Sequence, residues 1–456
     1  MKKLRSTVLL CSLLAQPLGA QQQGDALSRA TFFDLGVTLL RDNHAQDAAN
    51  VADTLISTRP NDAAALVLRA EAAIVLGDFA GAARYAARAY RNTTSRSQKF
   101  GAARLVALAH AQLKQDTRAQ LWLRRAREFS PDQQTANGLA KDYQFLRERN
   151  PWATTLRFGL APSSNINNGS ARLTSQLLGL PIEFNLDGEA RALSGWQVSG
   201  GFDVEYRIDA TRTSASFATF SADYRTYFLS KSAEIQAPDA VGSDFADGGL
   251  SFGITHKQIL SEGGKPTDFV LKAGQVWYGG DLYSRYIEAR IGHTWDLGNK
   301  DKLSMSVSRQ ARLTSLNNDP VLSQIDGLSV RWFHSLSNRD RFSLGASLNN
   351  STSDDADSTY DSMAYSVSYD PFEPIFGMQL GFGLDTETRN FDSFRLSGGA
   401  PHEDKSVGLN MSVNFTNVEY YGFQPVINFS ARRNDSTLDL FDREYFSAGF
   451  DLRSSF

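Results

Sequence analysis

From residue 151 onwards, large apolar residues alternate with small or polar ones, as they do along β-strands. Segment 376–384 has a large apolar residue at every even position, namely Phe376, Met378, Leu380, Phe382 and Leu384. The same period of two recurs in 342–348, 407–415 and 423–429. Successive side chains of a strand point to opposite faces, so each segment predicts a strand with one apolar and one polar face.

We count about fourteen strands, and most reach the roughly 9–11 residues that a tilted strand needs to cross a bilayer. They begin near residues 153, 194, 212, 244, 266, 281, 300, 325, 339, 358, 375, 403, 421 and 444. The connections alternate between short turns and longer polar loops. The turns are 208–212, 261–265, 298–301 and 337–339, and the loops are 162–193, 230–243, 314–324, 351–357 and 392–402. This asymmetry predicts an antiparallel transmembrane β-barrel, with Gly279-Gly280 as one short connection where a loop is expected.

A soluble β-sandwich would show the same alternation, so the number of strands and the last segment decide between the two folds. Phe446, Phe450 and Leu452 share a face of the last strand, and the sequence ends on Phe456. A terminal aromatic after an amphipathic strand resembles the signal that the barrel-assembly machinery recognises. We therefore predict a barrel over residues 151–456, with Phe450, Leu452 and Phe456 as its assembly signal.

Residues 25–150 follow a different pattern, rich in alanine, leucine and arginine and poor in β-branched residues, which favours helices. Leu35-Gly36, Ala48, Leu55 and Pro60 have the spacing of a tetratricopeptide repeat, a helix pair of about 34 residues. Equivalent small residues recur 34 and then 37 positions later, at Ala70, Ala82, Ala89, Ala107, Ala119 and Ala126. An ordinary alanine-rich helical bundle is the alternative to this repeat domain.

In tetratricopeptide proteins the first helix of each pair lines a concave surface that binds peptide segments. By this resemblance, seven positions would form the client-binding groove: Phe33, Val37, Leu40, Val67, Ile74, Arg104 and Leu108. The surface is mostly apolar, which suits an apolar or amphipathic client. The alternative is that these residues pack against a neighbouring helix, such as the one predicted over 133–147.

The N-terminus adds a location. Lys2, Lys3 and Arg5 precede an apolar stretch, and small residues end at Ala20, so residues 1–20 predict a secretory signal peptide. Cys11 is the one cysteine of the sequence, so the mature chain would contain neither a disulfide nor a thiolate metal site. The formal charge of −3 becomes −6 without the leader, which gives no electrostatic case for nucleic acid. Mean hydropathy is −0.33, and an outer-membrane barrel is compatible with that value.

No enzyme motif stands out, and we predict neither catalytic residues nor a cofactor. The six histidines lack a metal-ligand spacing, and the sequence has no GxSxG elbow and no phosphate-binding loop. A site assembled from distant strands would leave no such motif. The acidic run at 354–357 is either a calcium site or, as we prefer, a solvated loop tip.

The whole mature chain resembles the surface lipoprotein assembly modulators (Slam proteins), which join an N-terminal repeat domain to a barrel of about fourteen strands. The resemblance is sharpest where Asn150-Pro151-Trp152 leads into the first strand and 165–168 reads Asn-Ile-Asn-Asn. The residue before that segment, usually acidic in the family, is Ser164 here. Polysaccharide-export porins also join repeats to a barrel, but usually with far longer repeat arrays.

The resemblance implies an outer-membrane factor that delivers surface lipoproteins or related secreted clients to the cell surface. Its partners would be the client, outer-membrane lipids and the barrel-assembly machinery, with the repeat domain in the periplasm. The alternative function is an outer-membrane porin for polysaccharide or solute export. A lumen rich in Asp, Arg and aromatic residues along a clear path would favour the porin. The sequence does not identify the client or the oligomeric state.

Removing Phe456 should slow insertion into the outer membrane, because the terminal aromatic is the predicted assembly signal. We expect lower outer-membrane levels and more periplasmic degradation, measured by fractionation and immunoblotting against the unaltered chain. Normal levels of the truncated chain would show that Phe456 has no such role.

Overall fold

The computed structural model describes residues 23–176, 182–316, 319–416, 418 and 423–454. The chain forms two compact units that divide between Asn150 and Pro151, and each is described by itself. The first is helical and the second is built on strands. The predicted signal peptide and Phe456 lie outside the described residues.

The described part of the first unit contains seven helices. They are α1 (Gln23–Arg41), α2 (Ala45–Thr58), α3 (Ala63–Val75), α4 (Phe79–Arg91), α5 (Arg96–Gln112), α6 (Asp116–Glu128) and α7 (Gln133–Arg149). Consecutive helices contact one another, and α3 also contacts both α1 and α5. Within the described ranges, no helix has the length and apolar character required to span a membrane.

Three helix hairpins, α1–α2, α3–α4 and α5–α6, turn in the same way. Each turn contains a residue in the left-handed conformation: Asn43, Gly77 and Lys114, with φ of 70°, 79° and 57°. The next residue of each turn donates its N–H to the carbonyl five positions earlier, at 2.8, 2.8 and 2.9 Å. Such bonds satisfy carbonyls that the end of a helix leaves free. The turns are 34 and 37 residues apart, so the hairpins repeat at the spacing seen in the sequence.

Alanine forms much of the helical core. The seven repeat alanines are at most 2% exposed: Ala48, Ala70, Ala82, Ala89, Ala107, Ala119 and Ala126. Short side chains let neighbouring helices approach closely, and the larger Phe100, Leu123, Leu139 and Leu146 fill the space between α5, α6 and α7. The hairpins therefore stack through small residues, while α7 covers the last hairpin with larger ones.

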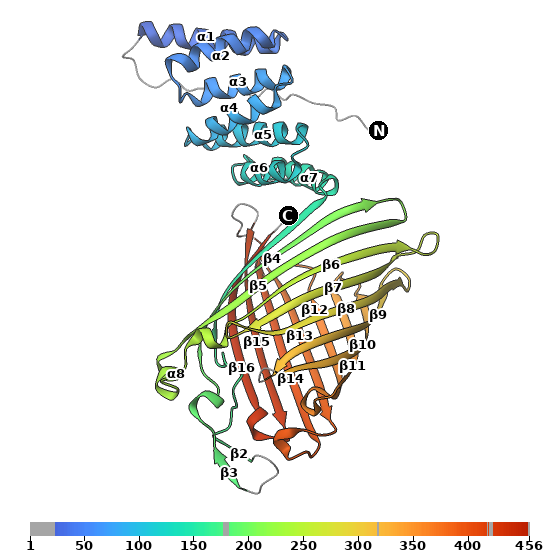
Figure 1. Ribbon diagram of the computed structural model, residues 1–456. Coiled ribbons are helices and arrows are strands. Elements are labelled where there is room, and N and C mark those ends of the chain that lie inside the picture. The colour runs from blue at the N-terminus through green and yellow to red at the C-terminus, as the bar shows by residue number, and fades with distance from the viewer. Residues whose placement is uncertain (1–22, 177–181, 317–318, 417, 419–422, 455–456) are drawn as a thin grey trace. The chain divides into compact units, whose positions relative to one another are not determined.

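The second unit is a closed barrel of fourteen antiparallel strands, and the predicted fold class is confirmed (Figure 1). The strands are β1 (Trp152–Ser163), β4 (Gly195–Ala210), β5 (Ser214–Leu229), β6 (Asp247–Ile259), β7 (Pro266–Tyr278), β8 (Asp281–Asp296), β9 (Asp301–Leu316), β10 (Asp319–Ser335), β11 (Arg341–Ser353), β12 (Tyr360–Asp370), β13 (Met378–Phe391), β14 (His402–Phe415), β15 (Phe423–Ser436) and β16 (Arg443–Ser454). Each pairs with its sequence neighbour in the barrel, and β16 returns to β1. A separate hairpin is formed by β2 (Thr174–Gln176) and β3 (Glu183–Asn185).

The cross-strand register places apolar residues on one face of the sheet and polar residues on the other. Leu156, Phe202 and Leu250 lie in one row across β1, β4, β5 and β6, through Ala222. Of these, Leu156, Phe202 and Leu250 are 42%, 39% and 43% exposed. Charged residues alternate with them along the same strands. A continuous exposed apolar face on a closed barrel is the lipid-facing surface of an outer-membrane protein, and we assign it as the outer face.

The two ends of the barrel differ. One end, here called the loop end, includes the connections 164–194, 230–246, 354–359, 392–401 and 437–442. It contains β2, β3 and the short helix α8 (Lys231–Gln236) (Figure 1). The other end, the turn end, includes the described turns 211–213, 260–265, 297–300, 336–340 and 371–377. The first residue of β1 and the last of β16 both lie at the turn end.

Two connections at the loop end differ from a simple pattern of long loops. Gly279 and Gly280 join β7 to β8 in a tight turn with φ of 60° and 91°, which glycine adopts without strain. The predicted long loop over 314–324 is wrong, because β9 continues to Leu316 and β10 begins at Asp319. Leu313 pairs with Leu322 and Leu316 with Asp319, so backbone pairing extends through a polar stretch that resembles a loop.

A closed barrel has all its strand hydrogen bonds inside the protein, so it should resist mild detergent. We expect unboiled and boiled samples of the membrane-extracted protein to migrate differently on a gel. Identical migration of the two samples, together with solubility in the absence of detergent, would contradict a transmembrane barrel.

Candidate functional site

The seven predicted groove residues lie on three helices of the first unit. Phe33, Val37 and Leu40 are on α1, Val67 and Ile74 on α3, and Arg104 and Leu108 on α5. Because α3 contacts both other helices, the order across this face is α1, α3, α5. Five of the residues are half-buried, while Arg104 is exposed and Leu108 is 39% exposed. We call this set the first-helix face.

Part of the first-helix face also supports the core. Leu40, Val67 and Ile74 each pack against a buried cluster of the helical unit. The helix predicted over 133–147 is α7, and it contributes Leu139, Tyr143 and Leu146 to the cluster around Phe100. Leu108 is not among the residues of that cluster, although Ala107 beside it is. The larger apolar side chains of this face therefore contact the core and also remain partly exposed to solvent.

Glu71 of α3 also belongs to this face, although it is not one of the seven predicted groove residues. It lies 34 residues after Val37 and 37 before Leu108, so the repeat spacing alone identifies it as their equivalent. The side chain is half-buried, and burial raises the pKa of Glu71 to about 6. Within the described ranges, no hydrogen bond or ion pair reaches its carboxylate, whereas Asp53 on α2 pairs with Arg69 at 2.8 Å.

The Asn-Ile-Asn-Asn segment, 165–168, holds the first long connection in place. Asn165 donates to the carbonyls of Gly169 at 2.9 Å and Glu444 at 3.2 Å, and accepts from the N–H of Gly169 at 2.9 Å. Asn167 donates to the carbonyls of Glu189 and Arg191 at 2.7 and 2.8 Å. Ile166 is buried between them, in a cluster with Leu193, Tyr227, Ala233 and Ala237. The segment therefore joins the first two long connections of the loop end.

Ser164 also has a structural contact. Its hydroxyl accepts the N–H of Phe446 at 2.8 Å, and its own N–H donates to the Phe446 carbonyl at 3.0 Å. Further along the same connection, Arg172 pairs with Asp442 at 2.7 Å. The connection therefore crosses from β1 to β16 and to the loop before β16, which braces the place where the barrel closes.

The acidic run at 354–357 is not a freely solvated loop tip, which corrects the preferred interpretation of the sequence. Arg395 from the next long connection pairs with Asp355 at 2.7 Å and with Asp357 at 3.1 Å. The two carboxylate side chains are only 14% and 24% exposed. The partner lies 38 residues later in the chain, so the local sequence gave no sign of it.

A further cluster at the loop end surrounds His402, the first residue of β14. Its side chain is buried, and its ring lies 4.5 Å from the Phe394 ring and 5.5 Å from the Phe441 ring, measured between centroids. Its Nδ1 atom is 2.8 Å from the Thr437 hydroxyl oxygen. Connections 392–401 and 437–442 thus pack on one histidine, and no sequence motif marks it.

The inner face of the barrel has two contrasting walls. Across β13 to β16 and on to β8 it is charged, with ion pairs such as Arg157–Asp203, Arg389–Glu387 and Arg432–Asp385. Across β9 to β12 small neutral residues predominate, although Arg331 of β10 lies among them, paired in register with Ser304 and Gly345. The register places there Ser304, Ser306, Ser308, Ser343, Gly345, Ser347, Ser362, Ala364, Ser366 and Ser368. The lining is therefore charged on one wall, whereas the other wall consists mostly of serines and other small residues around Arg331.

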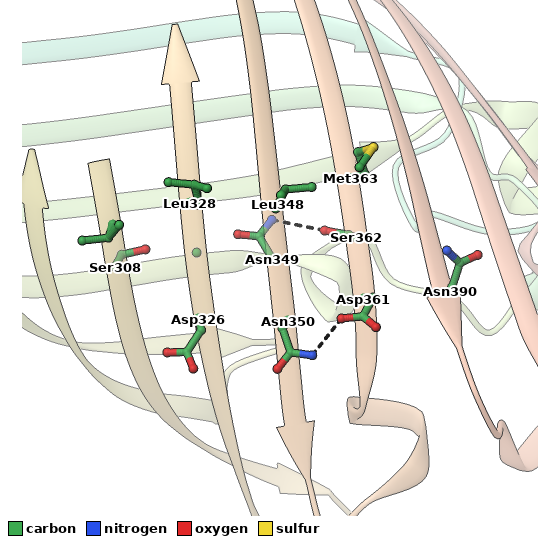
Figure 2. Close-up of a pocket in the computed structure, with 12 residues that line it drawn as sticks. Ser308, Asp326, Leu328, Leu348, Asn349, Asn350, Asp361, Ser362, Met363 and Asn390 are labelled. Carbon is green, nitrogen blue, oxygen red and sulfur yellow. Dashed lines mark hydrogen bonds between the residues drawn. The ribbon is translucent and has the colours of Figure 1, made fainter. Parts of the chain in front are cut away.

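The outer face is interrupted by a polar row across β9 to β13, beside a hollow of about 600 Å³ (Figure 2). Arg309 donates to both carboxylate oxygens of Asp326, at 2.6 and 2.7 Å. The row continues in register through Asn350, Asp361 and Asn390, and Asn350 donates to Asp361 at 2.7 Å. Bonds within the row satisfy polar groups that would otherwise be costly on a lipid-facing surface.

Comparisons with known proteins identify no family. No family model matches the chain, and no curated protein matches its sequence. Among solved structures, the chain is similar to OccAB4 of Acinetobacter baumannii, with 10% identity, a TM-score of 0.33 and coverage of 66% of this chain and 97% of that one. The chain is also similar to a BenF-like porin from Pseudomonas fluorescens, with 8% identity, a TM-score of 0.32 and coverage of 66% of this chain and 97% of that one. For a bacterial polysaccharide outer membrane secretin, the identity is 7%, the TM-score is 0.29, and the coverage is 66% of this chain and 98% of that one.

Asn165→Ala should loosen the first long connection, because it removes three hydrogen bonds worth about 1 kcal/mol each. Local opening rises roughly tenfold for each 1.4 kcal/mol lost. We expect trypsin to cleave the folded protein after Arg172 or Arg191 at least tenfold faster. The control is Asn168→Gly, where an exposed asparagine has φ of 54° and glycine fits the backbone. Equal cleavage of Asn165→Ala, the control and the unaltered protein would show that the segment does not hold the connection.

Proposed function

We propose that the protein is an outer-membrane translocation factor that delivers surface lipoproteins or related secreted clients to the cell surface. This is the function implied by the resemblance to the surface lipoprotein assembly modulators. In the proposal the helical unit binds the client in the periplasm and the barrel guides it across the membrane. The proposal assigns no reaction chemistry to either unit and requires no cofactor.

The even number of strands supports a periplasmic location for the helical unit. With fourteen strands, both ends of the barrel segment lie at the turn end. In outer-membrane barrels the short turns face the periplasm and the longer loops face outwards. A helical unit that precedes β1 by two residues of chain would then be periplasmic.

The observation that best supports client binding is the first-helix face. The first helices of three successive hairpins each present apolar side chains on this face that are partly exposed, with Leu108 39% exposed. An apolar or amphipathic client segment would bury these side chains and gain roughly 1.5–3 kcal/mol for each fully buried medium-sized one. The outer membrane has no nucleotide supply, so client folding outside the cell or transfer from a chaperone would provide the free energy for delivery.

A second function, a porin for solute or polysaccharide export, is supported by the charged wall of the lumen. Ion pairs such as Arg389–Glu387, at 3.0 Å, suit a water-filled passage. Single-channel conductance in planar bilayers separates the two functions. A stable, permanently open conductance favours the porin, and a closed barrel favours the translocation factor.

Replacing Val37 and Leu108 together with Asp should weaken client capture by orders of magnitude, because two charges would have to be desolvated on an apolar surface. The measurement is protease shaving of whole cells that express a lipoprotein encoded beside this gene. Surface exposure of the lipoprotein should fall while its total amount and the level of inserted barrel stay constant.

The matched control is Leu35→Asp with Leu121→Asp, two leucines that are 47% and 51% exposed away from the first-helix face. This control should leave exposure of the lipoprotein unchanged. If a chain without residues 25–150 still delivers the lipoprotein normally, client recognition by the helical unit is wrong and the porin becomes the better proposal.

A further inference from the structure

Glu71 places one carboxylate in the middle of an otherwise mostly apolar face. Its helix, α3, is the central one of the three, with α1 and α5 on either side. Val67 and Ile74 lie one turn before and after it on α3, so they share its side of the helix. Val37 and Leu108 occupy the equivalent positions on the flanking helices.

The carboxylate has no partner inside the described part of the protein. The other acids near the hairpin ends are used: Asp62 pairs with Arg29, and Asp78 accepts the N–H of Gly81 at 2.8 Å. Arg104, the charged member of the first-helix face, interacts with Asp142 of α7, where burial raises the pKa of the acid and Arg104 lowers it. Glu71 is therefore half-buried among apolar side chains, and no described side chain pairs with its carboxylate.

A half-buried acid without a partner is unfavourable for folding when its surroundings are apolar. Burial raises the pKa of Glu71 from 4.5 to about 6, so the folded helices are penalised once the carboxylate ionises. That penalty is absent below the unfolded pKa and complete above the folded one, hence at neutral pH. Glutamine at this position would remove the penalty, so stability does not explain the acid.

We propose that Glu71 pairs with a lysine or arginine in the client segment that binds to the first-helix face. This inference rests on the proposed function and specifies its substrate. The client segment would be amphipathic, with one cationic side chain among apolar ones. The apolar neighbours would exclude water from the ion pair, and an ion pair in a dry site is both stronger and more selective than one in water. A segment without the cation would leave the carboxylate buried and unpaired, which disfavours it.

The test uses the full-length protein in detergent and labelled amphipathic peptides that differ at one residue of their apolar face: lysine, glutamine or glutamate. Binding is measured by fluorescence anisotropy. A hydrogen-bonded ion pair predicts that the lysine peptide binds roughly tenfold to a hundredfold tighter than the glutamine peptide. Glu71→Gln should remove that preference, and Glu71→Lys should transfer it to the glutamate peptide.

The thermal stability of Glu71→Gln provides a second readout. If Glu71 only stabilised the fold, this variant would melt at a lower temperature. The helical signal of Glu71→Gln should melt at the same or a higher temperature than that of the unaltered protein at neutral pH. Asp47→Asn is the control, because it removes an exposed acid of α2 from the same unit. It should leave the lysine preference intact.

The outcomes separate the two proposals. Equal binding of the lysine and glutamine peptides, with no effect of Glu71→Gln, overturns the ion pair and leaves client binding by the apolar face in place. Lower stability of Glu71→Gln together with unchanged peptide preference would show that Glu71 serves the fold. Failure of the unaltered protein to bind any of the peptides overturns this inference. If Val37→Asp with Leu108→Asp then also leaves surface delivery unchanged, the proposed function fails with it.

Discussion

Inside a bilayer, every backbone N–H and C=O group needs a partner within the protein, and the barrel described here closes where β1 pairs with β16 between Gly159 and Ser163. The described register at this seam is short: Gly159 pairs with Asp451, Leu160 with Phe450 and Ser163 with Ser447. By contrast, β1 pairs with β4 along its whole length. A Cβ atom on Gly159 would lie 2.6 Å from an Asp451 oxygen, so glycine lets the two strands meet beside a charged side chain. The rest of the barrel depends on this short closure.

The loop end reinforces the seam from one side. Ser164 and Asn165 bond to the backbone of β16, and Arg172 pairs with Asp442 just before that strand. The amide-rich segment that marks the family resemblance thus has a mechanical role in this chain. At the other end of β1, α7 ends at Arg149 and the strand begins at Trp152, with Asn150 bonded to Thr117 and Gln120 of α6. Along the chain, β1 therefore follows directly after the helices, and its pairing with β16 is the shortest in the barrel as described.

Much of the barrel could be predicted from the sequence because alternation is a local pattern. Strand starts agree to within a few residues, and the exception is β10, which begins at Asp319 instead of near residue 325. There, polar residues continue the strand because pairing with β9 does not depend on apolar side chains. The helix hairpins could likewise be predicted, because alanine spacing and turn residues such as Gly77 repeat along the sequence.

Interactions between distant segments could not be predicted. Arg395 reaches the acids at 355 and 357, and Phe394 stacks on His402, through loops whose sequences carry no pairing signal. Glu71 is a different case, since the repeat spacing identifies its position although the apolar pattern does not include it. A polar residue at a position where the repeat otherwise has apolar ones is the more informative signal. In our proposal this acid marks a binding partner, whereas another apolar residue would indicate only packing.

In the proposed function, a polypeptide client contacts the first-helix face and then the lumen of the barrel. With Cys11 in the predicted leader, the mature chain is free of cysteine, so single cysteines can be introduced cleanly. The measurement is disulfide trapping in cells between a cysteine-bearing lipoprotein, encoded beside this gene and stalled by a folded fusion, and a cysteine at either Val67 or Ser347. We expect adducts at both positions, with fewer at Val67 when Glu71 is changed to Gln. Delivery of the lipoprotein to the surface with no adduct at either position would contradict it.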